Sequence, residues 1–536
     1  MTEFHEHARR FREAKIIGVD MATSGPDPRS DSIESVHFAA DGIPALHVDC
    51  RSLPGGGADA LRDIFSADSV KVFADAKLPL QFLAALGIHV RLLFDVSLAE
   101  RLLYLPGQPY ESGGGSTAGD LLRARAAMLP RIYENGLAEV AQIEFKCLRA
   151  VAHMEYEGIY LNTGKWEELG REKAAERERA LADLRQYDAE PEYQNTLWGK
   201  QEISQPNYDS NALVLDLLRR NGIDVAGTSR RELLPYRENP LVVALTRYRR
   251  ASKAISSFLR PIPGFLNPAS GRLHPKYDQL TAFSGRMSCS NPNIQQIPRE
   301  KAFRECFTAP PGRRLVIADY SQIELRVVAE ISADKRMLAA YRAGEDLHLL
   351  TASYIANKPA HLVSKQERQA YKAVNLGLIY GMGAAGLQLS ARQSYGVEMS
   401  MDDATLFRRR FFETYGGVAR WHRGIKEDGD GIGRTLSGRR FAYSSGAGLP
   451  ERSNLPVQGT SADIIKKALG ILAEKVTAGG VIVGVVHDEI LLECPEADTE
   501  AASNLLKDAM EEAANTILPH VPTIVEPVVA DSWAGK

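Results

Sequence analysis

The sequence predicts a multidomain protein that combines an α/β part with an α+β part. Its 536 residues are too many for one hydrophobic core and suffice for roughly three or four domains. Short apolar runs alternate with a helical pattern over residues 15–105, which is typical of a small α/β unit, whereas the pattern after residue 137 is mainly helical. The glycine- and serine-rich residues 110–120 between them predict a connecting loop.

A nearly balanced charge gives no overall sign of a nucleic-acid partner. The chain has 65 basic and 68 acidic residues and a formal net charge of −3, so such a partner must be held by local patches. One patch is expected over residues 247–314, where Lys and Arg greatly outnumber Asp and Glu. This run fits contact with a phosphate backbone, and the sequence supports a solvated basic face equally well.

Other features bear on the class and location of the protein. The five scattered cysteines include no CxxC pair, so neither a zinc site nor a disulfide framework is indicated. The charged N-terminal stretch is unlike a secretory signal, and no apolar run approaches the length that spans a membrane. We expect an intracellular, soluble protein with no membrane partner.

Two segments place carboxylates where metal ions could be held. The run LVIAD predicts a buried strand that ends on Asp319, although an aspartate that caps the next helix is an alternative. Residues 481–495 predict a β-hairpin with His487, Asp488 and Glu489 at its tip, where an ordinary polar turn is the alternative. If Asp319 faces Asp488, the pair could hold two Mg²⁺ ions that activate a hydroxyl group and stabilise a departing pyrophosphate.

A helical stripe over residues 368–383 has the character of a nucleotide site. Arg368, Lys372, Leu376 and Tyr380 recur every four residues. Their stripe is about 18 Å long at a rise of 1.5 Å per residue. The two cations could hold phosphates while the aromatic ring meets a base. An amphipathic helix with a cationic edge is the alternative.

Taken in chain order, these three segments resemble motifs A, B and C of family A DNA polymerases, the bacterial polymerase I type. DYSQIELR (319–326) and VHDE (486–489) match motifs A and C, and the R-x3-K-x7-YG frame matches motif B. The resemblance covers residues 140–536 well and residues 1–139 weakly. Further family segments follow in the expected order at residues 281–298, 345–348, 435–440 and 456–468.

The resemblance implies an RNase H-like exonuclease-type domain followed by a right-hand polymerase with thumb, palm and fingers. It also implies template-directed addition of dNTPs to a primer 3′ end, with primer–template DNA as partner and no 5′-nuclease domain. Two Mg²⁺ ions are the implied cofactors, and Mn²⁺ could replace them. With this resemblance we expect a monomer in the cytoplasm of a bacterial or phage-infected cell. The expected parts are a degenerate 3′–5′ exonuclease-like domain (1–138), the thumb (139–270), the palm (271–335 and 435–536) and the fingers (336–434).

Individual roles are also implied, each at a position that matches a family motif. Metal binding is expected of Asp319, Asp488 and the backbone of Tyr320, with Glu489 in support. Lys372 is the implied proton donor to pyrophosphate, and Glu324 is the steric gate against a 2′-hydroxyl. The full set of expected nucleotide contacts is Arg368, Lys372, Leu376, Tyr380, His348, Gln322 and Glu324. The expected DNA contacts are Arg286, Gln458, His487, Asn293 and Arg440.

Three departures from the family pattern affect these expectations. Leu376 stands where the family usually has an aromatic that packs on the incoming sugar and base. Leucine offers less flat area, so we expect weaker nucleotide binding or slower incorporation, with altered discrimination against sugar analogues. Gln296 replaces a usual Asn, which is a mild change. The segment 451–459 is two residues shorter than is typical between Arg452 and Asn454, which leaves the assignment of these two residues open.

The front domain lacks acids that a two-metal exonuclease needs. The first family segment usually reads D-x-E, whereas here a strand is expected to end on Asp20, with Ala22 two residues later. In the second segment Pro79 replaces the essential aspartate. A site that has lost two acids leaves adjacent phosphate charge uncompensated. We therefore expect the remnant of a metal site and no proofreading activity.

Four other aspartates in this domain do not change that expectation. Asp95 keeps its place before a helix, and Asp120 remains in the third segment without its tyrosine. Neither Asp75 nor Asp27 is expected to replace the missing acids, because Asp75 lies four residues before Pro79 on a different backbone segment.

Three other interpretations stay open at this point. The first is an accessory translesion or repair polymerase of the same family. The second is a single-subunit RNA polymerase, although Glu324 argues against it. The third is a catalytically silent DNA-binding scaffold, which the intact Asp319, Asp488, Arg368 and Lys372 disfavour.

Overall fold

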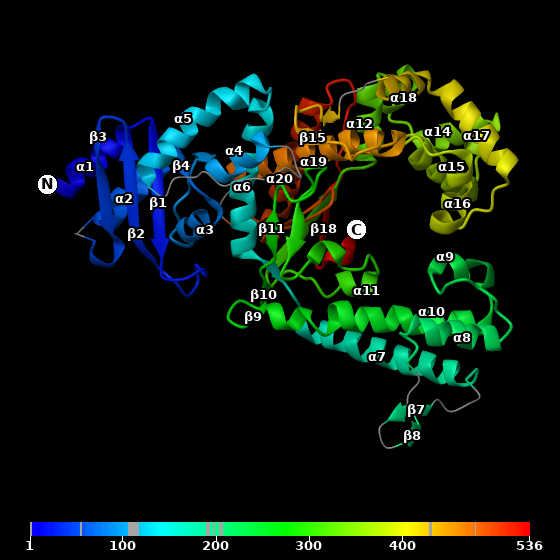
Figure 1. Ribbon diagram of the computed structural model, residues 1–536. Coiled ribbons are helices and arrows are strands. Elements are labelled where there is room, and N and C mark those ends of the chain that lie inside the picture. Colours follow the sequence, from blue (N-terminus) through cyan, green and yellow to red (C-terminus); the bar gives the residue numbers. More distant parts are fainter. Residues whose placement is uncertain are drawn as a thin grey trace. The chain divides into compact units, whose positions relative to one another are not determined.

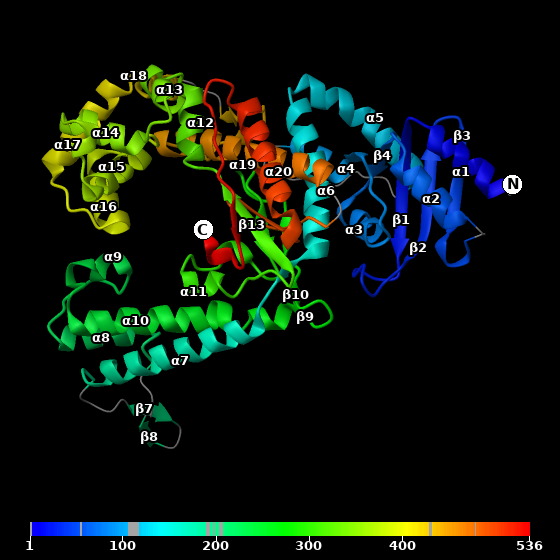
Figure 2. The same cartoon turned by 180° about the vertical axis from the view of Figure 1, so that it is seen from behind.

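The computed structural model describes residues 3–53, 56–104, 117–188, 193–196, 199–202, 207–427, 431–476 and 479–536. Most of the connecting loop expected at residues 110–120 lies outside these ranges. The chain divides into two compact units (Figures 1 and 2). Unit 1 comprises Met1–Ile159, His274–Gln296 and Ala309–Lys536, and unit 2 comprises Tyr160–Leu273 and Ile297–Thr308.

Unit 1 begins with a five-stranded mixed sheet, here called the front sheet, in the order β3-β2-β1-β4-β5. Strands β1, β2 and β3 are antiparallel, whereas β4 and β5 run parallel to β1. Asp41 and Gly42 form the two-residue turn between β2 and β3, and the positive φ of Gly42 suits such a turn. The strands are β1 (Ile16–Thr23), β2 (Ile33–Ala40), β3 (Ile43–Asp49), β4 (Val70–Phe73) and β5 (Leu92–Asp95).

Helices cover both faces of the front sheet and bury two hydrophobic clusters (Figure 1). One cluster joins Phe11, Val19 and Phe38 with other side chains, and the other joins Val72, Phe94 and Leu121. The helices are α1 (Glu3–Glu13), α2 (Gly57–Ser66), α3 (Lys77–Ala85), α4 (Val96–Leu103), α5 (Ala118–Glu134) and α6 (Ala138–Glu157).

Strand β1 continues past Asp20, so the expectation that it ends there is wrong. Asp20 is exposed and pairs with His37 of β2, and the pairing extends to Thr23 with an irregularity after Ala22. The end of the strand is set by its hydrogen-bonded neighbour β2 rather than by the end of the apolar run. The close approach of α5 also needs Gly18, because a Cβ there would lie 2.0 Å from the carbonyl oxygen of Ala118.

A second sheet of unit 1, the central sheet, is antiparallel in the order β16-β17-β13-β18. Its apolar strands are almost fully buried, as the continuous apolar runs predict. Helix α20 packs on β13 and β17, and α19 packs on α20 and α6. The elements are β13 (Arg313–Asp319), β16 (Val481–Val486), β17 (Glu489–Pro495), β18 (Val528–Ala530), α12 (Ile323–Ser332), α19 (Leu449–Lys475) and α20 (Thr499–Ile517).

A group of helices, α13 to α18, forms the rest of unit 1 together with short strand pairs. The helix expected over residues 368–383 begins at Lys365, where Ser364 and Glu367 form a capping box, and ends at Leu378, so Tyr380 follows its last residue. The elements are α13 (Lys335–Arg342), α14 (Leu347–Ala356), α15 (Lys365–Leu378), α16 (Ala384–Tyr395), α17 (Met401–Thr414), α18 (Gly416–Glu427), β11 (Lys276–Asp278), β12 (Ser288–Ser290), β14 (Ile432–Arg434) and β15 (Arg440–Ala442).

Unit 2 is built around the packed helices α7 and α10. Apolar side chains such as Leu184, Leu217 and Leu245 form its core, and the indole of Trp166 donates to the Leu259 carbonyl at 3.2 Å. Its elements include α7 (Thr163–Arg185), α8 (Asn211–Arg220), α9 (Arg230–Leu233), α10 (Pro240–Ala254), α11 (Lys301–Arg304), β7 (Tyr193–Thr196), β8 (Gly199–Glu202), β9 (Leu266–Asn267) and β10 (Arg272–Leu273).

A buried charge network joins α6 to α19 within unit 1. Lys466 donates to Glu144 at 2.6 Å, and Arg439 pairs with Glu144 and, at 2.7 Å, with Asp463. All four side chains are at most 4% exposed. Burial alone would raise the pKa of Glu144, but Lys466 and Arg439 outweigh it and hold this pKa below its usual value. Two cations therefore balance two anions in the core.

Loss of one member should destabilise unit 1. We expect Lys466→Met to cost about 3–5 kcal/mol in free energy of unfolding, because it leaves buried charge uncompensated. The control is Lys467→Met on the same helix, whose half-exposed pair with Glu139 spans 3.4 Å and should contribute at most about 1 kcal/mol. Urea unfolding followed by circular dichroism measures both, and equal midpoints for the two variants would contradict the network's importance.

Candidate active site

The register of the central sheet brings the two candidate metal-binding segments together. Asp319, the last residue of β13, lies directly opposite Glu489, the first residue of β17. His487 and Asp488 form the turn between β16 and β17, as the sequence predicted. The Tyr320 amide donates to the Asp488 carbonyl at 3.3 Å. Asp319 and Asp488 therefore lie at the same end of the sheet.

Two neighbouring side chains are fixed in the core and have supporting positions. Glu489 is 7% exposed and accepts a hydrogen bond from the indole of Trp533 at 2.9 Å. The Tyr320 hydroxyl donates to the Met510 carbonyl at 2.7 Å, and burial raises the pKa of this phenol well above its usual value. The Tyr320 side chain thus points away from the site, which leaves its backbone for a metal ion.

The donor set suits a hard divalent cation. The Asp319 carboxylate is 43% exposed and pairs with the ammonium of Lys536, so a cation already lies against it. No three His, Cys, Asp or Glu side chains of the described ranges gather around one point. Asp319, Asp488 and the Tyr320 carbonyl would therefore leave several coordination positions to water and phosphate oxygens, as Mg²⁺ prefers.

Three expected site residues contact one another beside α12. Arg286 donates to one carboxylate oxygen of Glu324 at 2.7 Å, and the Tyr380 hydroxyl donates to the other. Burial, followed by the charge of Glu324, raises the pKa of Tyr380. Gln322, just before α12, has a positive φ, and its buried Oε1 has no hydrogen-bond partner among the described residues. The Glu324 carboxylate is thus held from two sides.

The expected triphosphate contacts gather where α14 and α15 meet. Arg368 donates to Asp346 through Nε at 2.9 Å and through Nη2 at 2.6 Å. His348 is 3% exposed, and its Nδ1 pairs with the Asn375 amide at 2.8 Å. Burial is the main cause that lowers the pKa of His348 to about 4. His348 is therefore neutral at pH 7.

Asp346 lies in the family segment 345–348, but the sequence assigned it no role in this site. Its second oxygen accepts the backbone N–H groups of His348 and Leu349 at the start of α14, at 2.9 and 3.1 Å. Burial would raise the pKa of Asp346, but Arg368 and these hydrogen bonds lower it overall. The available signal was an aspartate directly before a helical run, which is typical of an N-cap.

The expected DNA contacts have varied surroundings. His487 is exposed with a positive φ, whereas Gln458 lies half-buried in α19. Asn293 accepts the Gln295 amide at 3.1 Å. The guanidinium of Arg440 is engaged within the protein, because it donates to the Asn135 side chain and the Leu103 carbonyl.

Part of the expected basic run is neutralised by acids. Within unit 2, Arg247 pairs with Asp183 at 3.2 Å and Arg250 with Glu300 at 2.9 Å. Other members of the run, Lys253, Arg260 and Arg299, are at least partly exposed and have no ion pair among the described residues. Within this run, these three cations therefore remain available to phosphate.

The aspartates retained in the front domain have structural partners. Asp95 is buried and accepts the amides of Leu98 at 2.8 Å and Ala76 at 2.6 Å, so it caps α4. Its burial outweighs these hydrogen bonds and raises its pKa to about 7. Asp120 forms a capping box with Thr117 at the start of α5. Neither side chain is arranged as a metal ligand.

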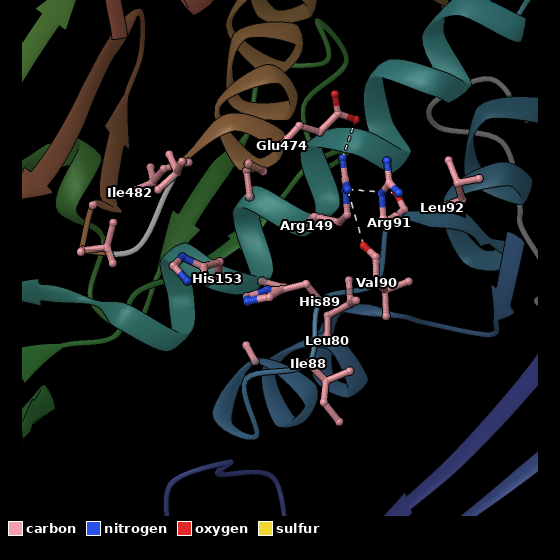
Figure 3. A pocket seen from close by; sticks show the side chains of 18 of the residues that line it. Leu80, Ile88, His89, Val90, Arg91, Leu92, Arg149, His153, Glu474 and Ile482 are labelled. Atoms are coloured by element: carbon pink, nitrogen blue, oxygen red, sulfur yellow. Dashed lines mark hydrogen bonds and ion pairs between the residues drawn. The ribbon is translucent and has the colours of Figure 1, made fainter. Parts of the chain in front are cut away.

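A pocket of about 750 Å³ is lined by neither Asp319 nor Asp488 (Figure 3). It is lined by parts of β5, α6, α19 and the start of β16, whereas Asp488 follows the other end of β16. Arg149 lies in it and donates to Glu474 at 2.7 Å and to the Arg91 carbonyl at 2.9 Å. The pocket is therefore a junction between elements of unit 1, away from the expected chemistry.

Comparison with known proteins decides the family. The model of DNA polymerase family A matches residues 214–535, which is more than half of the chain. The chain belongs to DNA polymerase family A. The resemblance based on motifs A, B and C is thereby confirmed, and with it the class of DNA-directed DNA polymerases.

Relatives within family A include bacterial polymerases. DNA polymerase I of Aquifex aeolicus (strain VF5) is 35% identical over 77% of this chain and 70% of that protein. The thermostable DNA polymerase I of Thermus filiformis is 33% identical over 76% of this chain and 49% of that protein. The chain thus spans about half the length of the Thermus relative.

A solved structure has a similar fold. It is the POL domain of Pol1 from M. smegmatis in complex with DNA primer-template and dNTP, with a TM-score of 0.82 and 24% identity. The match covers 99% of this chain and 98% of that chain. The expectation of a mixed α/β multidomain fold is confirmed. No described helix is both long and apolar enough to cross a membrane.

The low pKa of His348 predicts a pH dependence. Between its ordinary value of 6.5 and about 4, the unfolded chain binds a proton that the folded chain does not. Stability should therefore fall as the pH drops through this window, by up to about 3 kcal/mol. The free energy of unfolding of wild type relative to His348→Gln, measured from pH 7 to 4, tests this. The control is the exposed His361→Gln, and parallel pH curves for wild type and His348→Gln would contradict the assignment.

Proposed function

We propose that the chain adds dNTPs to the 3′ end of a DNA primer under the direction of a template, by two-metal-ion nucleotidyl transfer and without proofreading. The observation that carries this proposal is the register of β13 with β17, which puts Asp319 and Asp488 at one end of the central sheet. The M. smegmatis protein of similar fold is in complex with DNA primer-template and dNTP, which supports the same ligands here.

The proposed chemistry assigns a task to each group of side chains. Asp319, Asp488 and the Tyr320 carbonyl would hold two Mg²⁺ ions, which when bound activate the primer hydroxyl and neutralise charge on the leaving pyrophosphate. Arg368 and Lys372 would bind the triphosphate, and Lys372 would donate a proton to pyrophosphate. The Asp346 carboxylate occupies Arg368 before the nucleotide arrives, so the triphosphate would replace it.

Glu324 would act as the steric gate for the sugar. Arg286 and Tyr380 hold both of its oxygens, so the carboxylate cannot turn away from a 2′-hydroxyl without breaking two hydrogen bonds. This rigidity supports dNTPs over rNTPs as substrates, and therefore supports a DNA polymerase over a single-subunit RNA polymerase. Arg286, His487 and Gln458 would contact the primer–template minor groove, where the acceptors are nearly independent of sequence.

We also propose how the expected domains map onto the structure. The mixed front sheet supports an RNase H-like, degenerate exonuclease-type domain over residues 1–138. The central sheet supports the palm, helices α13 to α18 support the fingers, and the long helices of unit 2 support the thumb. Helix α6, expected at the start of the thumb, belongs to unit 1. The bacterial relatives support a cytoplasmic location, and the monomeric state stays a prediction.

Removal of either carboxylate should abolish primer extension. We expect Asp319→Asn and Asp488→Asn each to lower the rate of dNTP incorporation by at least about 10³-fold, because each would remove a charge that holds the metal ions. Asp531→Asn is the matched control, since its exposed carboxylate pairs with Arg314 near the same sheet. Single-turnover extension of a primer–template with Mg²⁺ provides the measurement. Near wild-type rates in both active-site variants would refute the proposal.

The absence of proofreading is tested with a mismatched primer end. The protein with Mg²⁺ and no dNTP should leave a 3′-mismatched primer intact, because Ala22 and Pro79 supply no carboxylates. Asp20→Ala should change nothing in this assay. Excision of the mismatch that Asp20→Ala abolishes would overturn the prediction.

Leu376 should limit nucleotide binding. Leu376→Phe adds a flat ring on the half-buried stripe of α15, and we expect roughly a threefold to tenfold lower KM for dNTP or a comparable rise in rate, from about 1 kcal/mol of added packing. Steady-state incorporation of one dNTP measures both constants, with dideoxynucleotides as a readout of sugar discrimination. Unchanged values of rate and KM would contradict this role of the leucine.

A further inference from the structure

Two histidines form a close pair on a part of the front sheet that the helices leave exposed. His37 of β2 and His47 of β3 are directly opposite in the antiparallel register, and both side chains are exposed. Nδ1 of His47 lies 2.9 Å from Nε2 of His37. Their ring centroids are 4.2 Å apart. The proposed polymerase chemistry uses neither ring.

Carboxylates flank this pair on the same face. Asp20 of β1 is directly opposite His37, and side chains that oppose each other on neighbouring strands share a face. Asp20, His37 and His47 thus form one row across β1, β2 and β3, which are adjacent strands of the front sheet (Figure 1). Asp49 lies two residues after His47 and therefore on the same face, where its carboxylate accepts from Arg51 at 3.0 Å.

We propose that His37 and His47 bind a divalent transition-metal ion, Cu²⁺ or Ni²⁺, with Asp20 as a further ligand from the same row. Imidazole nitrogen is a preferred ligand of these ions, and mixed nitrogen and oxygen sets are typical of their tetragonal sites. Two metal–imidazole bonds of about 2.0–2.1 Å at a right angle place their nitrogens roughly 2.9 Å apart, whereas a tetrahedral ion needs roughly 3.3 Å. The 2.9 Å between these nitrogens, which a hydrogen bond now spans, is thus also a spacing that the right-angled arrangement can use.

Binding requires only a small rearrangement. A hydrogen bond now joins the two nitrogens, and an ion bound to both would lie to one side of the line between them, so both rings would turn toward it while the shared hydrogen passes to solvent. No three ligating side chains of the described residues converge as they stand, so the Asp20 side chain would rotate toward the ion and water would complete its shell. The site thus differs in ligand chemistry from the oxygen-only donor set of Asp319 and Asp488.

Isothermal titration calorimetry of the full chain tests the proposal. Chelator-treated protein is titrated with NiCl₂ in excess Mg²⁺, which keeps the carboxylates of the central sheet occupied. We expect one saturable site whose affinity falls by roughly tenfold or more in His37→Ala and in His47→Ala, and less in Asp20→Asn. His7→Ala, which removes a partly buried histidine of α1 in the same domain, should bind as wild type does.

Spectroscopy gives a second readout that a general effect on folding would not mimic. Electron paramagnetic resonance of bound Cu²⁺ should show two equatorial nitrogens in wild type and at most one in either histidine variant. Primer extension with Mg²⁺ should stay unchanged in all of these variants, so this test is independent of the polymerase proposal. Saturable binding that survives both histidine substitutions, or its absence in wild type below about 1 mM metal, would overturn the proposal.

Discussion

The antiparallel register between β13 and β17 is the constraint on which the candidate active site depends. It runs from Arg313 opposite Pro495 to Asp319 opposite Glu489. A slip by one residue would move every side chain of one strand to the other face. Both strands are apolar and almost fully buried on both faces, so such a slip would break the fit of their side chains against the packed layers on each face. Burial therefore fixes the position of the carboxylates at the end of the sheet.

Ion pairs in unit 1 fall into two groups, which differ in how easily a ligand can replace one partner of the pair. The network of Glu144, Arg439, Asp463 and Lys466 is almost fully buried. Removal of one member leaves a buried charge that neither a partner nor water can compensate. By contrast, the pairs on the candidate active site are partly exposed, with Arg368 at 40%. Exposed pairs contribute about 0–1 kcal/mol, so a triphosphate or a metal ion can replace one partner at little cost. The buried pairs hold the scaffold, and the exposed pairs occupy carboxylates of the candidate site before ligands bind.

Local patterns predicted the elements well, and long-range pairing decided what they missed. The strand that ends on Asp319 and the hairpin around Asp488 follow from apolar runs with polar ends, and the helix of Arg368 follows from its four-residue period. The end of β1 could not be predicted, because its pairing with β2 carries the strand past Asp20. Asp346 was missed for a similar reason, since its contact with Arg368 joins residues 22 positions apart. The pairing of His37 with His47 likewise depends on a strand register that no single segment reveals.

Cleavage of the chain by bound iron tests the location of the active site most directly. Fe²⁺ that replaces Mg²⁺ reduces added hydrogen peroxide to hydroxyl radicals, which cut the backbone beside the ion, and ascorbate returns the Fe³⁺ to Fe²⁺. If Asp319 and Asp488 hold the catalytic metal ions, cuts should fall next to these two residues. The cuts should diminish with excess Mg²⁺ and disappear in the double variant that carries both Asp319→Asn and Asp488→Asn. An enzyme that extends primers with Mg²⁺ but shows no Mg²⁺-sensitive cut at either position would contradict the account.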